Sequence, residues 1–250
     1  EISKSKPIFI VGPRELSDKR IMELLGKLSR GGKQILFGIL KDEYILGLEG
    51  SPQFKTLKYE TLTSILEDNS SLSRSSSLTR KTGLSILQYF QRDLKYIVKE
   101  LEFSLVIFIN GSWYKTLYTL PEFWEVVNKK IPYKLISPFI KEDEAVRYIE
   151  DKRGEIEKLC EFDAAKKYSD HEIMEVVDKV AKKSYATDFQ TSCALVKDSK
   201  ILITAYNNVI PFETYAMHYG LQKEKFFDPP NDLNHFDTNH AEVDILIKAQ

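Results

Sequence analysis

The first 40 residues alternate between strand-like and helix-like segments, and this order restricts the fold more than any other feature of the sequence. KPIFIVGP is a short run of β-branched and aromatic residues closed by Gly12-Pro13, which is typical of a buried strand and a turn. SDKRIMELLGKLSRGG has helical apolar spacing, with Ser17 placed to cap its start and Gly31-Gly32 to stop it. QILFGIL has the composition of a second strand. Strand, helix and strand with short connections predict a parallel βαβ unit.

Further segments extend this pattern to about residue 140. FSLVIFIN (103–110) is the most strand-like run in the chain, and YKLISPF (133–139) predicts a last strand. PEFWEVVNKK predicts a helix with Pro121 in its first turn. LSILQYFQRDLKYIVKEL (84–101) has the spacing of an amphipathic helix. We therefore expect residues 1–140 to form a doubly wound, Rossmann-like α/β domain of about four strands.

The expected first domain contains three candidate ligand-binding segments. The Ser-rich stretch 66–83 is too polar to offset its ordering entropy and predicts a mobile surface loop, with a phosphate-binding loop as the alternative. In doubly wound sheets, ligands bind at the carboxyl ends of the strands. Ser112, Trp113 and Tyr114 follow the strongest strand and are candidate ligand contacts. Arg14 lies near a helix start that could bind an anion. However, FIVGPREL matches neither of the two phosphate-binding patterns, G-x-x-x-x-G-K-[ST] and G-x-G-x-x-G. The alternative is a structural or partner-binding domain.

Charge and cysteine content limit the classes of partner. Lys and Arg number 36 against 37 Asp and Glu, so no global basic field favours nucleic acid, whereas a small nucleotide needs only a local cluster. The two cysteines, Cys160 and Cys193, cannot form a disulfide framework and indicate a reducing, cytoplasmic compartment. No run approaches the roughly 18 apolar residues of a membrane span. We expect no membrane association.

Residues 141–168 are charged and helix-prone, and they predict a helical connector between two domains. Its charge run is interpreted as a solvated face, and Cys160, on the apolar phase, as a buried structural thiol. From Ser169 the pattern changes again. Ser169 and Glu172 have capping-box spacing before an apolar helical face. SCALVKDSKILITAYNN then predicts a hairpin with its turn at 198–200, and a long loop leads to a last helix with a buried apolar face.

Three segments of this last region carry a resemblance: MEVVDKVAKKS, CALVKDSKILITAYNNVIP and HAEVDILIKA. Together, over residues 172–250, they resemble the cytidine and deoxycytidylate deaminase superfamily, and within it the deoxycytidylate branch. That branch has approximately GAVIVKDGKIISTGYNGVP and HAEMNAILNA at the second and third places. Cys193 and Ala205 stand where the family commonly has glycine, and so does Asn208. Cys193 lies at a strand position that is buried in that fold, and it is interpreted as structural and not as a ligand. The resemblance implies a three-layer α/β/α domain, of which residues 169–250 would be the N-terminal half.

The resemblance also implies a site chemistry. His240 would be one zinc ligand, Glu242 the catalytic residue that carries protons, and Asn207 a contact to the sugar of a cytosine nucleotide. In this family the zinc ion, bound by one His and two Cys, makes a nucleophile of bound water. The other interpretation of His240 and Glu242 is an ordinary helix start, where the helix dipole stabilises the negative charge of a glutamate.

The two cysteine ligands of the family lie in a P-C-x-x-C segment that these 250 residues lack. We expect the gene to continue past Gln250 and to encode it; the alternative is that another polypeptide supplies the remainder. The leading functional hypothesis is a hydrolase, a zinc-dependent deaminase of a cytosine nucleotide such as deoxycytidine monophosphate, assembled as a homo-oligomer. One alternative is a deaminase-fold binding or assembly protein without catalysis. A second is an RNA- or tRNA-editing deaminase.

Overall fold

The structure is a computed structural model, and it describes residues 6–30, 32–68, 83–210, 213–219 and 238–250. The chain divides into two compact units, each described by itself below. The first comprises residues 1–49, 54–113 and 117–140, and the second comprises 50–53, 114–116 and 141–250. The main division, after residue 140, agrees with the domain boundary that is expected from the sequence. The expected connector belongs to the second unit.

The first unit is built on a parallel sheet of five strands in the order β3-β2-β1-β4-β5. The strands are β1 (Ile8–Ile10), β2 (Ile35–Leu40), β3 (Leu84–Tyr89), β4 (Leu105–Ile109) and β5 (Tyr133–Ile136). Its α-helices are α1 (Asp18–Ser29), α2 (Tyr59–Asp68), α5 (Leu94–Glu100) and α6 (Pro121–Asn128). Short 3₁₀ turns occur at Pro52–Phe54, Gln91–Asp93 and Leu117–Thr119. This confirms the expected Rossmann-like α/β architecture.

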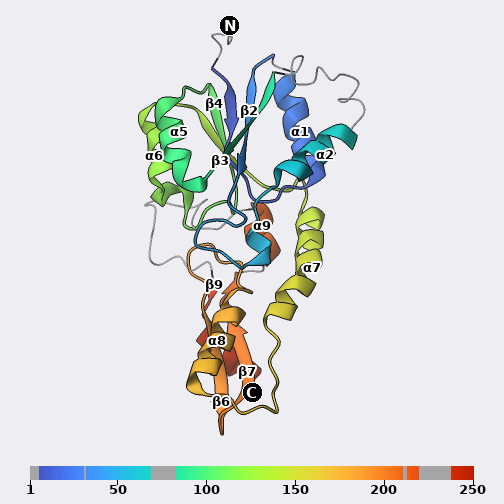
Figure 1. The fold of residues 1–250 in the computed structure, drawn as a ribbon, viewed down its shortest axis with the longest axis vertical. Coiled ribbons are helices and arrows are strands. Elements are labelled where there is room, and N and C mark those ends of the chain that lie inside the picture. The colour runs from blue at the N-terminus through green and yellow to red at the C-terminus, as the bar shows by residue number, and fades with distance from the viewer. Residues whose placement is uncertain (1–5, 31, 69–82, 211–212, 220–237) are drawn as a thin grey trace. The chain divides into compact units, whose positions relative to one another are not determined.

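Two hydrophobic clusters cover the two faces of this sheet. One contains Phe9 and Phe108 together with buried residues of α5 and α6, and the other contains Ile10 and Phe37 together with buried residues of α1 and α2. Side chains alternate between faces along each strand, so Phe9 and Ile10 enter different clusters. The result is a three-layer unit with α1 and α2 on one side and α5 and α6 on the other (Figure 1).

The prediction for residues 84–101 was wrong in its first part. Residues 84–89 form β3, and only Leu94–Glu100 form a helix. A short apolar run such as LSILQY fits both helical and strand periodicity, and here pairing with all six residues of β2 decides the outcome. The sheet therefore has one strand more than expected. The predicted loop in residues 66–83 lies mainly outside the described residues.

The second unit begins with α7 (Glu142–Leu159), followed by α8 (Asp170–Ala181) and the hairpin β6 (Ser192–Lys197) and β7 (Lys200–Tyr206). Smaller elements follow: β8 (Asn208–Val209), α9 (Glu213–Tyr219), β9 (Thr238–Asn239) and α11 (Ala241–Lys248). Asp198 and Ser199 form the two-residue hairpin turn, both with positive φ, as a type I′ turn requires. Both α8 and α11 pack against the hairpin (Figure 1).

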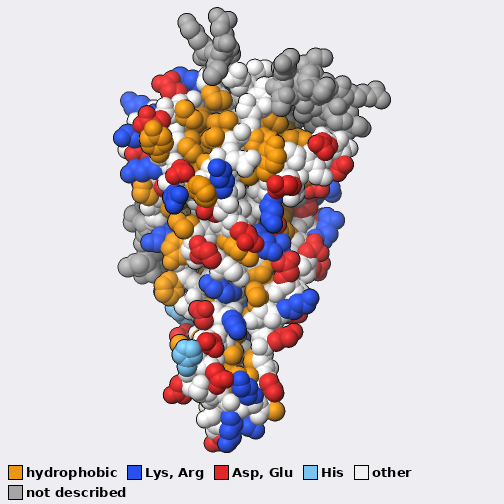
Figure 2. All heavy atoms as spheres, viewed as in Figure 1, with side chains coloured by type: hydrophobic (Ala, Val, Ile, Leu, Met, Phe, Trp, Pro, Cys, Tyr) orange, Lys and Arg blue, Asp and Glu red, His pale blue; other side chains and the backbone are white. Residues whose placement is uncertain are grey.

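The predicted capping signals are present. Ser17 accepts a hydrogen bond from the backbone N–H of Arg20 at the start of α1. Ser169 and Glu172 form a complete capping box at the start of α8. On the face drawn in Figure 2, basic and acidic side chains are intermingled. Among the described residues, no helix combines the length and apolar composition needed to cross a bilayer.

Candidate functional site

The start of α11 carries the two residues that the sequence marks most strongly. His240 is the N-cap residue, with extended backbone, and its carbonyl accepts hydrogen bonds from the N–H groups of Val243 and Asp244 at 3.1 Å. Glu242 lies in the first turn. Both side chains are exposed. An exposed imidazole and an exposed carboxylate two positions apart can reach a common ligand, but they do not enclose one.

The rest of α11 differs from the sequence-based prediction. Its apolar face was expected to be buried, yet Val243, Leu246 and Ile247 are 45%, 67% and 61% exposed. Within the helix only Ala241 is buried. The described residues thus cover one side of the helix and leave an apolar side open.

Asn207 is buried at the end of β7 and is fully engaged with neighbouring backbone. Its side-chain Oδ1 accepts from the N–H of Thr191 at 2.9 Å, and its Nδ2 donates to the carbonyl of Phe189 at 2.7 Å. Its own backbone N–H donates to the Thr191 carbonyl, and its carbonyl accepts from the Ser184 hydroxyl. In this conformation the residue fastens the segment before β6 to the end of β7. The predicted sugar contact stays a prediction.

Both cysteines lie in environments that favour the neutral thiol. Burial raises the pKa of the Cys160 thiol, which donates a hydrogen bond to the Lys179 carbonyl at 3.4 Å. Burial also raises the pKa of Cys193, and the carboxylates of Glu242 and Asp244 raise it further. Metal binding requires the deprotonated thiol. These environments fit the structural role expected for Cys160, and also for Cys193 although it is only half-buried.

The metal implied by the resemblance can be tested against the donor set. Within the described ranges, no group of three His, Cys, Asp or Glu side chains could hold a metal ion. His240 offers one imidazole nitrogen, and Glu242, in the resemblance, is not a ligand. The described residues therefore fit at most one of the three ligands of a catalytic zinc site.

The candidate contacts in the first unit lie at its topological switch point. The strand order changes direction between β1 and β4, and residues after these two strands meet there. Arg14, which follows β1, is fully buried, and its backbone N–H donates to the Ser112 hydroxyl at 3.0 Å. The Arg14 guanidinium lies 5.5 Å from the centre of the Phe54 ring. The chain's own arginine side chain thus occupies this part of the interior.

Ser112 and Trp113 are only 1% and 5% exposed, and Trp113 packs edge-on against Phe108 with ring centres 5.7 Å apart. Tyr114 is at the surface and groups with the second unit. The sequence placed the first two correctly at a strand end. It gave no signal for the burial of Ser112, because the contact with Arg14 joins segments that are far apart in the sequence.

Comparisons with protein-family models, with curated proteins and with solved structures found no match to this chain.

Proposed function

We propose that residues 169–250 form the N-terminal half of a zinc-dependent deaminase domain that acts on a cytosine nucleotide, with deoxycytidine monophosphate as the first substrate to test. The observation that carries this proposal is the order of elements. Helix α8, hairpin β6–β7 and helix α11 follow one another as the resemblance requires, and His240 and Glu242 lie at the start of α11. Neither the hairpin nor the H-x-E spacing alone would support it.

In this proposal each residue has one task. The His240 imidazole supplies a nitrogen ligand. The Glu242 carboxylate takes a proton from the attacking water and gives it to the ring nitrogen, and it then carries a second proton, from the added hydroxyl group, to the amino group that leaves as ammonia. A bound zinc ion would lower the pKa of a water molecule towards neutrality. Two thiolate ligands must come from outside the described residues.

The test is deamination by the full-length gene product, followed as ammonia release from deoxycytidine monophosphate. Removal of a general acid–base group costs on the order of 10²–10⁴-fold in rate, so Glu242→Gln should lose at least about 100-fold activity. The matched controls are His171→Ala and Glu175→Gln on α8, an exposed pair with side chains 84% and 58% accessible. They should keep full activity. Equal activity of Glu242→Gln and Glu175→Gln would refute the proposal.

The open apolar side of α11 favours one second candidate, a deaminase-fold binding or assembly protein without catalysis. That candidate predicts a metal-free protein that binds nucleotide in calorimetry and releases no ammonia. Turnover on RNA oligonucleotides but not on free nucleotides would instead indicate an editing deaminase.

A further inference from the structure

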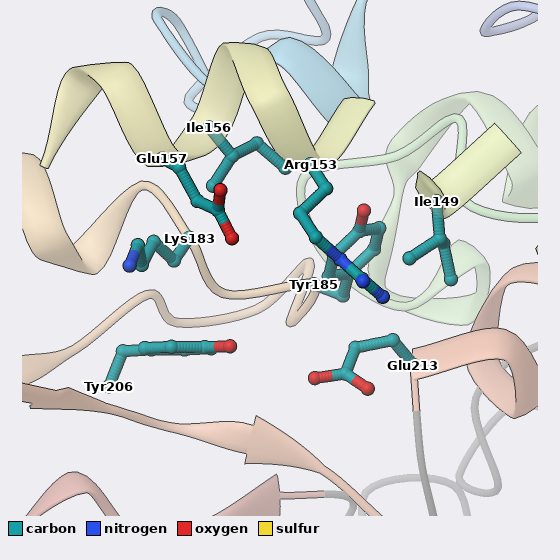
Figure 3. A pocket seen from close by; sticks show the side chains of 8 residues that line it. All are labelled: Ile149, Arg153, Ile156, Glu157, Lys183, Tyr185, Tyr206 and Glu213. Carbon is teal, nitrogen blue, oxygen red and sulfur yellow. The ribbon is translucent and has the colours of Figure 1, made fainter. Parts of the chain in front are cut away.

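A cavity of about 180 Å³ lies within the second unit, between α7, the residues that follow α8, the end of β7 and the start of α9. Two isoleucines of α7 form its apolar part. Its polar lining consists of Arg153, Glu157, Lys183, Tyr185, Tyr206 and Glu213 (Figure 3). His240, Glu242 and Asn207 do not line it. The inference below is therefore independent of the proposed deaminase function.

The α7 residues of this lining share one helix face. Ile149, Arg153, Ile156 and Glu157 follow the i, i+4, i+7 and i+8 spacing that places residues on the same side of a helix. Arg153 and Glu157 are exposed, as the interpretation of this charge run as a solvated face expects, and they also line the cavity.

The charged lining is balanced. Arg153 and Lys183 provide two cations, and Glu157 and Glu213 provide two carboxylates. None of the four makes an ion pair with another residue in the part of the chain that the structure describes. A lining of zero net charge gives no advantage to a polyphosphate. It suits an uncharged ligand that both donates and accepts hydrogen bonds.

The cavity also has an aromatic platform. In Figure 3 the ring of Tyr206 is seen edge-on, with its face turned towards Arg153 and Glu157. The Lys183 ammonium lies 6.0 Å from the centre of this ring. Burial raises the pKa of Tyr206 to about 12, and the carboxylates of Glu213 and Asp244 contribute. The phenol therefore stays protonated well above physiological pH.

We propose that this cavity binds a nucleobase that carries an exocyclic amino group, in the form of a nucleoside. The base stacks on Tyr206, since aromatic side chains bind bases through their π-faces. The Glu157 and Glu213 carboxylates accept hydrogen bonds from the amino group, while Arg153 and Lys183 donate to ring nitrogen or carbonyl acceptors. The volume, below the roughly 300 Å³ of a drug-sized site, admits a base and leaves the sugar at the opening.

The test is calorimetric titration of the full-length protein with cytidine and adenosine, and with uridine and inosine, which lack the amino group. Cytidine should bind at least about tenfold more tightly than uridine, and adenosine more tightly than inosine by a similar factor. Uridine and inosine lack the amino group that would donate hydrogen bonds to the two carboxylates. Equal binding within each pair, or no binding of any of the four, would overturn the proposal.

Variants locate the site. Tyr206→Ala should weaken binding at least about tenfold and Tyr206→Phe much less, because the stacking ring is retained. Glu157→Gln, on the exposed surface of α7, should also weaken binding, whereas Glu150→Gln, on the same helix but outside the cavity, should not. Unchanged binding in folded Tyr206→Ala and Glu157→Gln, or an equal loss of binding in Glu150→Gln, would contradict the assignment.

Discussion

At the scale of single residues, glycines at the centre of the sheet in the first unit leave no room for a side chain. A Cβ added at Gly38 in β2 would lie 2.8 Å from the Ile10 carbonyl oxygen and 2.9 Å from the Gly12 nitrogen. These are backbone atoms, so the strands themselves would have to move. By contrast, a Cβ at Gly26 in α1 would meet no atom within 4 Å.

These two positions predict opposite effects of the same substitution. Gly38→Ala should lower the free energy of unfolding by about 1–3 kcal/mol, because it overpacks the sheet. Gly26→Ala should raise it by about 0.5–1 kcal/mol, since glycine in a helix interior is destabilising relative to alanine. Urea denaturation of both variants tests this. Stabilisation by Gly38→Ala would contradict the packing described for β1 and β2.

Two neighbouring asparagines separate a structural role from a ligand role. Asn207→Ala should destabilise the protein by about 1–3 kcal/mol, because the backbone groups of Phe189 and Thr191 lose their partners in a buried position. Asn208→Ala is the control, since Asn208 is half-buried and its side chain donates to the Tyr206 carbonyl at 3.2 Å. Thermal unfolding distinguishes them. If Asn207→Ala changed substrate affinity without lowering the melting temperature, its bonds to the backbone would be unimportant.

At the scale of elements, the caps and most strands could be predicted because their determinants are local. Ser17, the Ser169–Glu172 pair and the alternating β-branched runs act within a few residues. The segment 84–89 could not be assigned, because its pairing with β2 is a tertiary interaction. Likewise, the spacing of Val243 and Leu246 showed an apolar helix face but not which surface, if any, would cover it.

The capping box of α8 predicts a specific pH dependence. Hydrogen bonds from Lys166 and from Ser169 lower the pKa of Glu172 from 4.5 to about 2. A carboxyl whose pKa is lowered in the folded state stabilises that state above its ordinary pKa, and the contribution is lost as pH falls from about 4.5 towards 2. Glu172→Gln should therefore lower the melting temperature at pH 7 and have a progressively smaller effect at acid pH.

The control for this measurement is Glu175→Gln, an exposed glutamate of the same helix that lies outside the box. Glu175→Gln should change the pH dependence of the melting temperature less than Glu172→Gln does. A Glu172→Gln effect of the same size at pH 7 and pH 3 would show that the carboxylate charge does not stabilise the cap.

At the scale of the whole molecule, the sequence predicted the Rossmann-like unit and the order of elements in the second unit. It did not predict the cavity beneath α7, because Arg153, Lys183, Tyr206 and Glu213 come from four segments that only the fold brings together. It also did not predict that Arg14 would be buried at the switch point, since nothing in FIVGPREL distinguishes a surface arginine from an interior one. Local sequence patterns predict individual helices and strands, whereas a binding site depends on how the fold brings several segments together.

The proposal that α11 carries a catalytic metal ligand is tested most directly by locating zinc in crystals of the full-length gene product. Anomalous diffraction at the zinc edge should show one peak about 2.0–2.1 Å from a ring nitrogen of His240. The peak should disappear in His240→Ala and persist in His171→Ala. Folded protein without zinc, or zinc bound at a site that excludes His240, would contradict the account.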